Sequence, residues 1–239
     1  MNHPVPRRWC FALSTLLPAC AALPAAAQTN LSTLDSELQV GDLVFIRVTA
    51  LPFREVAAAT GSWTNHVGVV FDTSGAEPLI GESTFPTSKA TGMARFVARS
   101  EDGRVAVMRL ATPLTEAQRA DVRRAAEARM GIVYDTGFDL HSRRQFCSRY
   151  AREVPREATG ASLGEVETFA HLLERNSAAG LAFWRVWYFG RIPWARETVT
   201  PGSLLVSAAL RSVFDGRVAD PAPAARVRSS SAADGRYVW

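Results

Sequence analysis

The segment Gln145-Phe146-Cys147-Ser148-Arg149-Tyr150 places a cysteine at the start of a predicted helix. Residues 149–154 can form a short helix, and Pro155 is expected to end it. A helix N-terminus favours a thiolate, and a neighbouring imidazole can take the thiol proton. The pattern predicts that Cys147 is a nucleophile, with a buried structural thiol as the alternative.

The histidine that we interpret as the base leads the apolar run Asn65-His66-Val67-Gly68-Val69-Val70. Branched apolar residues in this density are typical of a buried strand. A lone histidine in such a run is more often a hydrogen-bonded core residue than a catalytic one. The hypothesis is that His66 moves the proton of Cys147.

The first 27 residues have the composition of a signal peptide. Arg7-Arg8 form a positive region, the stretch 9–23 is mostly apolar, and Ala25-Ala26-Ala27 offers a cleavage site before Gln28. We therefore expect an exported, periplasmic protein. The alternative is a lipoprotein, because Leu17-Pro18-Ala19-Cys20 loosely resembles a lipoprotein cleavage box that would leave Cys20 lipidated.

Cysteine usage and charge narrow the function classes. Cleavage before Gln28 removes Cys10 and Cys20, which leaves Cys147 unpaired in an exported protein. The formal net charge is +4, and the basic residues are scattered, which gives no support to nucleic-acid binding. The remaining histidines are His66, His141 and His171, and they show no metal-ligand spacing with the cysteine. We therefore expect no metal and no cofactor.

Hydrophobic patterning predicts the elements of one domain over residues 40–215, after a loose leader over 28–39 and before a disordered tail over 216–239. Strands and helices segregate along the chain, so the predicted fold class is α+β. Strands are expected over 43–48, 66–71, 79–83 and 104–110, and helices over 53–59, 116–130, 149–154, 165–175 and from 201 towards 214.

Residues 181–194 are the most aromatic part of the chain. This segment is expected to be part of the core. Two other interpretations are a hydrophobic substrate groove and a contact with a membrane interface.

Taken in order, these motifs resemble the NlpC/P60 papain-like cysteine hydrolases in their circularly permuted branch, the YiiX/YebB group, and the YebB-like proteins most. In unpermuted members the cysteine helix precedes the histidine strand, whereas here His66 comes first. The resemblance runs from about Val40 to about Ser207. It rests on the stretches 41–45, 65–69, 81–83, 142–148, 183–185, 192–194 and 198–201.

The resemblance implies a permuted papain-like fold, with an antiparallel sheet packed against helices. It assigns the nucleophile to Cys147, the base to His66 and the third polar residue of a triad to Glu82. It also places Tyr134 near the nucleophile, where its hydroxyl would donate to an oxyanion. The other interpretation of Tyr134 is a packed loop aromatic.

The implied function is an exported cysteine hydrolase that works through an acyl-enzyme. The first expectation is an amidase or peptidase on cell-wall peptide or a related amide. The alternative is a lipid acyl hydrolase or acyltransferase of the permuted branch. The non-enzyme alternative is a binding module on a degenerate hydrolase fold.

Overall fold

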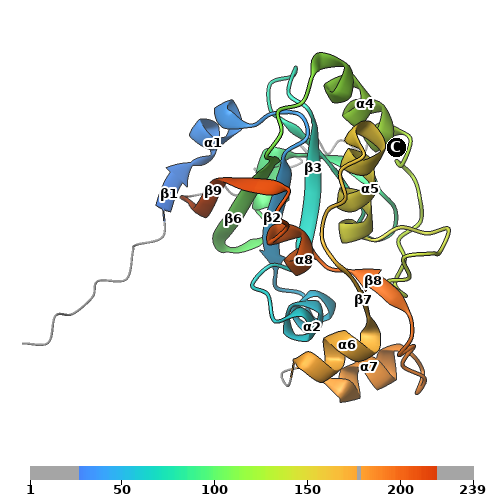
Figure 1. Ribbon diagram of the computed structural model, residues 1–239. Coiled ribbons are helices and arrows are strands. Elements are labelled where there is room, and N and C mark those ends of the chain that lie inside the picture. Colours follow the sequence, from blue (N-terminus) through green and yellow to red (C-terminus); the bar gives the residue numbers. More distant parts are fainter. Residues whose placement is uncertain (1–26, 177–178, 220–239) are drawn as a thin grey trace, which may run out of the picture.

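A seven-stranded sheet with the order β1-β9-β6-β2-β3-β4-β5 forms the centre of the computed structural model, which describes residues 27–176 and 179–219 (Figure 1). All neighbouring strands pair antiparallel except β1 and β9, which are parallel. The strands are β1 Ala27–Asn30, β2 Leu43–Val48, β3 His66–Asp72, β4 Leu79–Glu82, β5 Lys89–Gly92, β6 Ser100–Leu110 and β9 Leu210–Ala219.

The middle strands are apolar on both faces because each face of the sheet is covered. In β2, Leu43 and Phe45 pack on the side of α4 (Glu116–Glu127) and α5 (Cys147–Thr159). Val44 and Ile46 pack on the side of α1 (Leu31–Glu37) and α3 (Met93–Val97). This two-sided burial explains the continuous apolar runs of β2 and β3. The predicted α+β class and the strands at 43–48, 66–71 and 79–83 are confirmed.

Helices α4 and α5 lie side by side on one face of the sheet, whereas α6 and α7 lie at the lower end of the molecule in Figure 1. A two-stranded sheet of β7 (Val166–Thr168) and β8 (Glu197–Val199) lies between α5 and these lower helices. The helices are α1 Leu31–Glu37, α2 Leu51–Thr60, α3 Met93–Val97, α4 Glu116–Glu127, α5 Cys147–Thr159, α6 Phe169–Arg175, α7 Leu181–Trp187 and α8 Pro201–Leu205.

Pro155 does not end the cysteine helix, contrary to the prediction. Helix α5 continues to Thr159 and ends at Gly160, which adopts a left-handed conformation with φ 76°. Pro155 lies on the buried face of the helix together with Val154 and Ala158. Burial of this face offsets the hydrogen bond that proline cannot donate.

The expected leader and tail are wrong where the structure describes them. Residues 27–30 form β1, and Leu34 on α1 is 1% exposed. Residues 216–219 belong to β9, which pairs with both β1 and β6. This pairing connects the two ends of the described chain and extends the domain beyond 40–215. The signal peptide, apart from Ala27, and the tail from 220 onward lie outside the described residues.

Two expected helices also differ from the structure. The segment 165–175 begins as β7, and the helix starts only after Thr168, whose hydroxyl accepts a hydrogen bond from the His171 amide. The segment from 201 towards 214 forms the short helix α8 and then β9. Among the described residues, every helix is too short or too polar to span a bilayer.

Candidate active site

Cys147 is the first residue of α5, and its neighbours fix where the helix starts. Phe146 is buried and packs edge-to-face on Phe138, with 5.9 Å between ring centroids. The Ser148 hydroxyl donates a 2.7 Å hydrogen bond to the carbonyl of Val199 and so ties α5 to β8. Within the described part of the chain, no side chain caps the N–H groups of the first turn. These donors are therefore available beside the thiol.

Helix α5 approaches the sheet closely at β4 because residue 81 is a glycine. A Cβ on Gly81 would collide with the hydroxyl of Tyr150. This hydroxyl donates to the carbonyl of Ala126 at 3.1 Å and joins α5 to α4. Just beyond β4, the Ser83 hydroxyl donates to the carbonyl of Gln145 at 2.9 Å. These contacts hold the end of β4 against the start of α5.

His66 and Glu82 come from neighbouring antiparallel strands. Val69 pairs with Gly81 in the antiparallel ladder. One position further along, Glu82 lies opposite the residue that is two positions after His66, and this residue shares a face of the sheet with His66. Nε2 of His66 and Oε2 of Glu82 are 2.6 Å apart, and both side chains are fully buried. The register of β3 and β4 therefore builds the His–Glu pair.

The imidazole of His66 is enclosed by two phenyl rings. Phe96 stacks on it at 5.6 Å and Phe53 packs edge-on at 5.7 Å. Burial works to lower the pKa of His66, but the interactions with Cys147 and Glu82 outweigh it and raise the pKa to about 9. Because Glu82 engages Nε2, Nδ1 is the nitrogen left for the thiol proton.

Glu82 accepts hydrogen bonds from three side chains. Oε2 accepts from His66 and, at 2.8 Å, from Arg99, whereas Oε1 accepts from Thr91 at 2.6 Å. Burial works to raise the pKa of Glu82, but the three donors lower it to about 2. The Arg99 guanidinium also stacks over Phe96, at 4.8 Å from the ring centroid. The carboxylate is therefore ionised at neutral pH and stabilises a charged His66.

Tyr134 lies near the nucleophile because its segment pairs with the residue two positions before Cys147. The amide N–H of Gln145 donates to the carbonyl of Val133 at 3.0 Å. The amide N–H of Asp135 donates to the carbonyl of Gln145 at 2.7 Å. Burial, followed by the charges of Cys147 and Asp135, raises the pKa of Tyr134 well above its usual value. The phenol therefore keeps its proton and can act as a hydrogen-bond donor.

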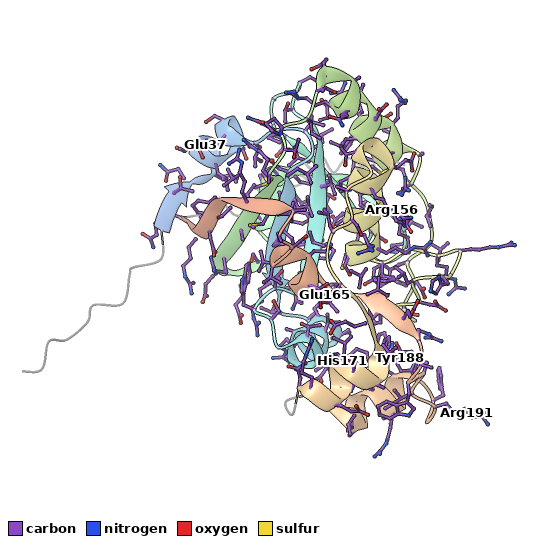
Figure 2. All side chains as sticks on the ribbon, in the orientation of Figure 1. Glu37, Arg156, Glu165, His171, Tyr188 and Arg191 are labelled. Carbon is purple, nitrogen blue, oxygen red and sulfur yellow. The ribbon has the colours of Figure 1, made fainter. Side chains whose placement is uncertain are left out.

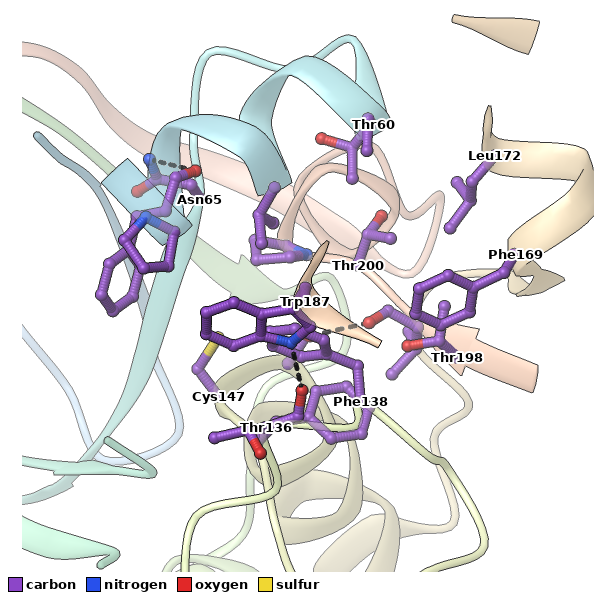
Figure 3. Close-up of a pocket in the computed structure, with 18 of the residues that line it drawn as sticks. Thr60, Asn65, Thr136, Phe138, Cys147, Phe169, Leu172, Trp187, Thr198 and Thr200 are labelled. Atoms are coloured by element: carbon purple, nitrogen blue, oxygen red, sulfur yellow. Dashed lines mark hydrogen bonds between the residues drawn. The ribbon is translucent and has the colours of Figure 1, made fainter. Parts of the chain in front are cut away.

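An apolar cavity of about 290 Å³ opens at the thiol of Cys147 (Figure 3). None of the described residues that line it is charged. Figure 3 shows Cys147 at one end, with Phe169 and Leu172 at the other. The walls come from α2, α6, α7, the segment 134–138 and the segment 198–201. The volume is close to the lower limit of about 300 Å³ for small-molecule sites.

The aromatic segment serves both the core and the cavity. Trp184 is 3% exposed and packs with Phe169 and Tyr188, yet it also lines the cavity. Trp187 also lines the cavity, and its indole N–H donates to the carbonyl of Thr136 at 2.9 Å (Figure 3). The segment is therefore part of the core, and it also forms part of the cavity wall.

The structure brings Cys147, His66, Glu82 and Tyr134 together, whereas His141 and His171 lie elsewhere. His141 pairs with Glu197 at 2.7 Å, and His171 lies on α6 beside Glu167 and Arg175. Sequence reasoning missed two partners of Glu82, namely Arg99 and Thr91. Neither carries a motif, because each reaches the carboxylate only through the packing of β5 and of the turn after α3.

The expectation that no metal takes part is contradicted by a structural neighbour. The crystal structure of YiiX from Escherichia coli O157:H7 is described as that of a metalloprotein. It has a TM-score of 0.70 and 24% identity, and the match covers 76% of this chain and 99% of that one. Within residues 27–176 and 179–219 of this chain, no three His, Cys, Asp or Glu side chains converge as metal ligands.

Sequence comparison gives the family. YiiX from Escherichia coli K12, described as uncharacterised, is 25% identical over 175 residues, which are 73% of this chain and 85% of YiiX. The family model of the permuted papain-like amidase enzymes, YaeF/YiiX, C92 family, matches residues 37–214. This match covers more than half of the chain and confirms the permuted papain-like fold. The chain therefore belongs to the permuted papain-like amidases of the C92 family, which are cysteine hydrolases.

Proposed function

We propose that this protein is a thiol amidase that cleaves an amide bond next to an apolar acyl group. One observation carries the proposal: the thiol of Cys147, with His66 and Glu82 behind it, lies at the end of an uncharged apolar cavity. A polar cell-wall peptide would find no charged partner among the lining residues. An acyl chain would bury its surface against aromatic and aliphatic side chains.

The reaction follows the logic of a catalytic triad. The sulfur of Cys147 attacks the amide carbon, and Nδ1 of His66 takes the thiol proton. The tetrahedral intermediate collapses when His66 returns this proton to the departing amine, which leaves a thioester on Cys147. Water then attacks the thioester and gives a proton to His66. Release of the acid and return of the proton to sulfur restore the enzyme.

Glu82 and the backbone of α5 have supporting roles in this scheme. Glu82 fixes Nε2 of His66 and stabilises the imidazolium that forms in both half-reactions. The uncapped N–H groups at the start of α5 would hold the oxyanion of each tetrahedral intermediate. The Tyr134 hydroxyl would supply a further donor, since its raised pKa keeps it protonated.

A chain-length series tests the substrate class. We expect N-acyl amino acids with longer acyl chains to be cleaved faster than short ones and faster than muropeptides, with Cys147→Ala inactive. Val56→Phe places a ring in the cavity wall and should shift the preference to shorter chains. Ala58→Phe adds the same ring to α2 at a position that does not line the cavity, and should leave the preference unchanged. Equal rates for all chain lengths, or a preference for muropeptides, would reject the apolar acyl group.

We also propose that the protein is exported and works in the periplasm, because residues 1–27 have the composition of a signal peptide. Protein sequencing of the chain purified from cells should give an N-terminus at or near Gln28. A chain that still begins at Met1 would contradict export. A lipidated Cys20 would place the protein on a membrane surface.

A further inference from the structure

The helix that lines the cavity with one face exposes apolar side chains on the other. Trp184 and Trp187 of α7 line the cavity. On the outside, Val186 is 79% exposed and Phe189, in the turn that follows α7, is 96% exposed. Together with Leu181, which is 38% exposed, they place three exposed large apolar side chains within nine consecutive residues. Isolated apolar side chains on a surface need no explanation, but such a concentration does.

Phe189 has an unusual backbone for an exposed aromatic residue. Its φ of 51° lies in the left-handed region, which bulky side chains rarely adopt. Its ring gains almost nothing from packing, because nearly all of its surface is exposed. Val186 lies in the last turn of α7, and Phe189 follows in the turn just after the helix end. Folding of the monomer does not account for this placement of the ring.

The charge of the same segment has one sign. Residues 179–196 contain three arginines and no acidic residue, although the whole chain has 23 acidic residues. Arg185 and Arg191 are exposed, and neither belongs to an ion pair between described residues. Figure 2 shows Arg191 extending away from the lower end of the molecule. Exposed cations beside exposed apolar groups complement an anionic phospholipid surface, where apolar groups enter the interface and arginines contact phosphates.

We propose that this surface, which we call the α7 face and define by Leu181, Arg185, Val186, Phe189 and Arg191, docks on a bilayer that contains anionic phospholipid. The lower end of the molecule, with α6 and α7, would then rest on the bilayer (Figure 1). The cavity that α7 lines would lie next to a source of apolar acyl groups. This consequence for the substrate rests on the proposed function, whereas the docking itself does not require catalysis.

Vesicle co-sedimentation tests the docking separately from the amidase activity. The full chain with Cys147→Ala, which prevents turnover, is mixed with vesicles of phosphatidylcholine alone or with about one-third phosphatidylglycerol. Three variants are compared in this background: Val186→Ser with Phe189→Ser, Arg185→Gln with Arg191→Gln, and Val206→Ser. Val206 has the same 79% exposure as Val186 but lies at the end of α8, so it is the matched control.

We expect the chain to bind the anionic vesicles more strongly than the neutral ones. The apolar pair and the arginine pair should each weaken anionic binding about tenfold or more, and the arginine pair should also abolish the preference for phosphatidylglycerol. Val206→Ser should bind like its parent. The proposal is overturned if the chain does not bind vesicles. It is also overturned if both α7 variants bind unchanged, because the contact would then belong to another part of the chain, such as the signal peptide. Self-association that is lost in the same variants would make the α7 face a protein interface and would also overturn it.

Discussion

At the scale of the residue, the central feature is a buried carboxylate that is shared by an imidazole and a guanidinium. Glu82 carries a negative charge at neutral pH, and Arg99 and the protonated His66 carry positive ones. Glu82 and His66 are fully buried, so an unbalanced charge there would be costly. Arg99 and His66 both donate to the same oxygen of Glu82. Lys89 pairs with Glu82 across the strands, but its side chain is exposed on the edge strand β5. Arg99 therefore keeps the carboxylate ionised while opposing the charge of the imidazolium.

Replacement of Arg99 by alanine should change the pH profile of amide cleavage as well as its rate. Without the guanidinium, Glu82 stabilises the His66 imidazolium more strongly, so the alkaline limb of kcat/KM should move up by about half to one pH unit. Arg99→Lys should keep most of the wild-type profile. Arg95→Ala removes an exposed arginine from α3 and serves as the control. A slower enzyme with unmoved limbs would give Arg99 a packing role only.

The Tyr134 hydroxyl can be tested without removing the ring. Tyr134→Phe should lower kcat about 10- to 100-fold with little change in KM, because an oxyanion donor acts in the transition state. Tyr188→Phe removes a phenol that donates to the carbonyl of Gly137 and should have a much smaller effect on kcat. If Tyr134→Phe retains full kcat, its phenol is a packed loop aromatic, as the second interpretation of the sequence had it.

At the scale of the element, the site depends on how closely α5 lies against β4. Gly81 allows this approach, and Tyr150 is the helix residue that fills the space above it. The same contact sets the distance between the start of α5 and the His–Glu pair.

Gly81→Ala should therefore displace α5 and impair both stability and activity. We expect a loss of about 1–3 kcal/mol in the free energy of unfolding, as for other overpacked cores. Tyr150→Phe removes the atom nearest to the new methyl group, so the double variant should recover part of this loss in urea unfolding. A single variant as stable and active as the wild type would show that α5 can shift without consequence.

The elements also show what local sequence patterns reveal and what they leave out. Cys147 and His66 could be picked out because each lies in a short motif beside a strong strand or helix signal, whereas Glu82 followed only from the resemblance to the family. The strand β9 was missed because charged residues interrupt it and its partners, β1 and β6, are far away in sequence. The cavity was only partly predictable, since α7 carries an aromatic signal but the wall from α2 does not. The burial of Pro155 likewise depends on tertiary packing.

At the scale of the whole molecule, the buried pair should make stability depend on pH. The pKa of His66 is raised to about 9, so its contribution is fully present below the unfolded pKa of about 6.5 and is lost as the pH rises through about 9. The pKa of Glu82 is lowered to about 2, so its contribution is present above about 4.3 and is lost as the pH falls through about 2.

We therefore expect the free energy of unfolding in urea to fall between about pH 6.5 and pH 9. Cys147→Ala should flatten this alkaline dependence, because Cys147 contributes to the raised pKa of His66. Arg149→Ala, which removes an ion pair with Glu153 on the same helix, is the control and should keep the slope. An alkaline slope that is the same in wild type and Cys147→Ala would show that the thiol does not act on His66.

The nucleophilic role of Cys147 is tested most directly by its rate of reaction with iodoacetamide at about pH 6, where an unperturbed thiol is almost wholly protonated. Full-length chains that retain the signal peptide also carry Cys10 and Cys20, so labelling is assigned to the Cys147 peptide by mass spectrometry. We predict that Cys147 reacts faster than a model thiol, that His66→Ala slows the reaction strongly and that Glu82→Gln slows it less. If Cys147 in the folded protein reacts no faster than the model thiol, although labelling at high pH shows it to be accessible, then it is a structural thiol. In that case the protein is a binding module on a hydrolase fold.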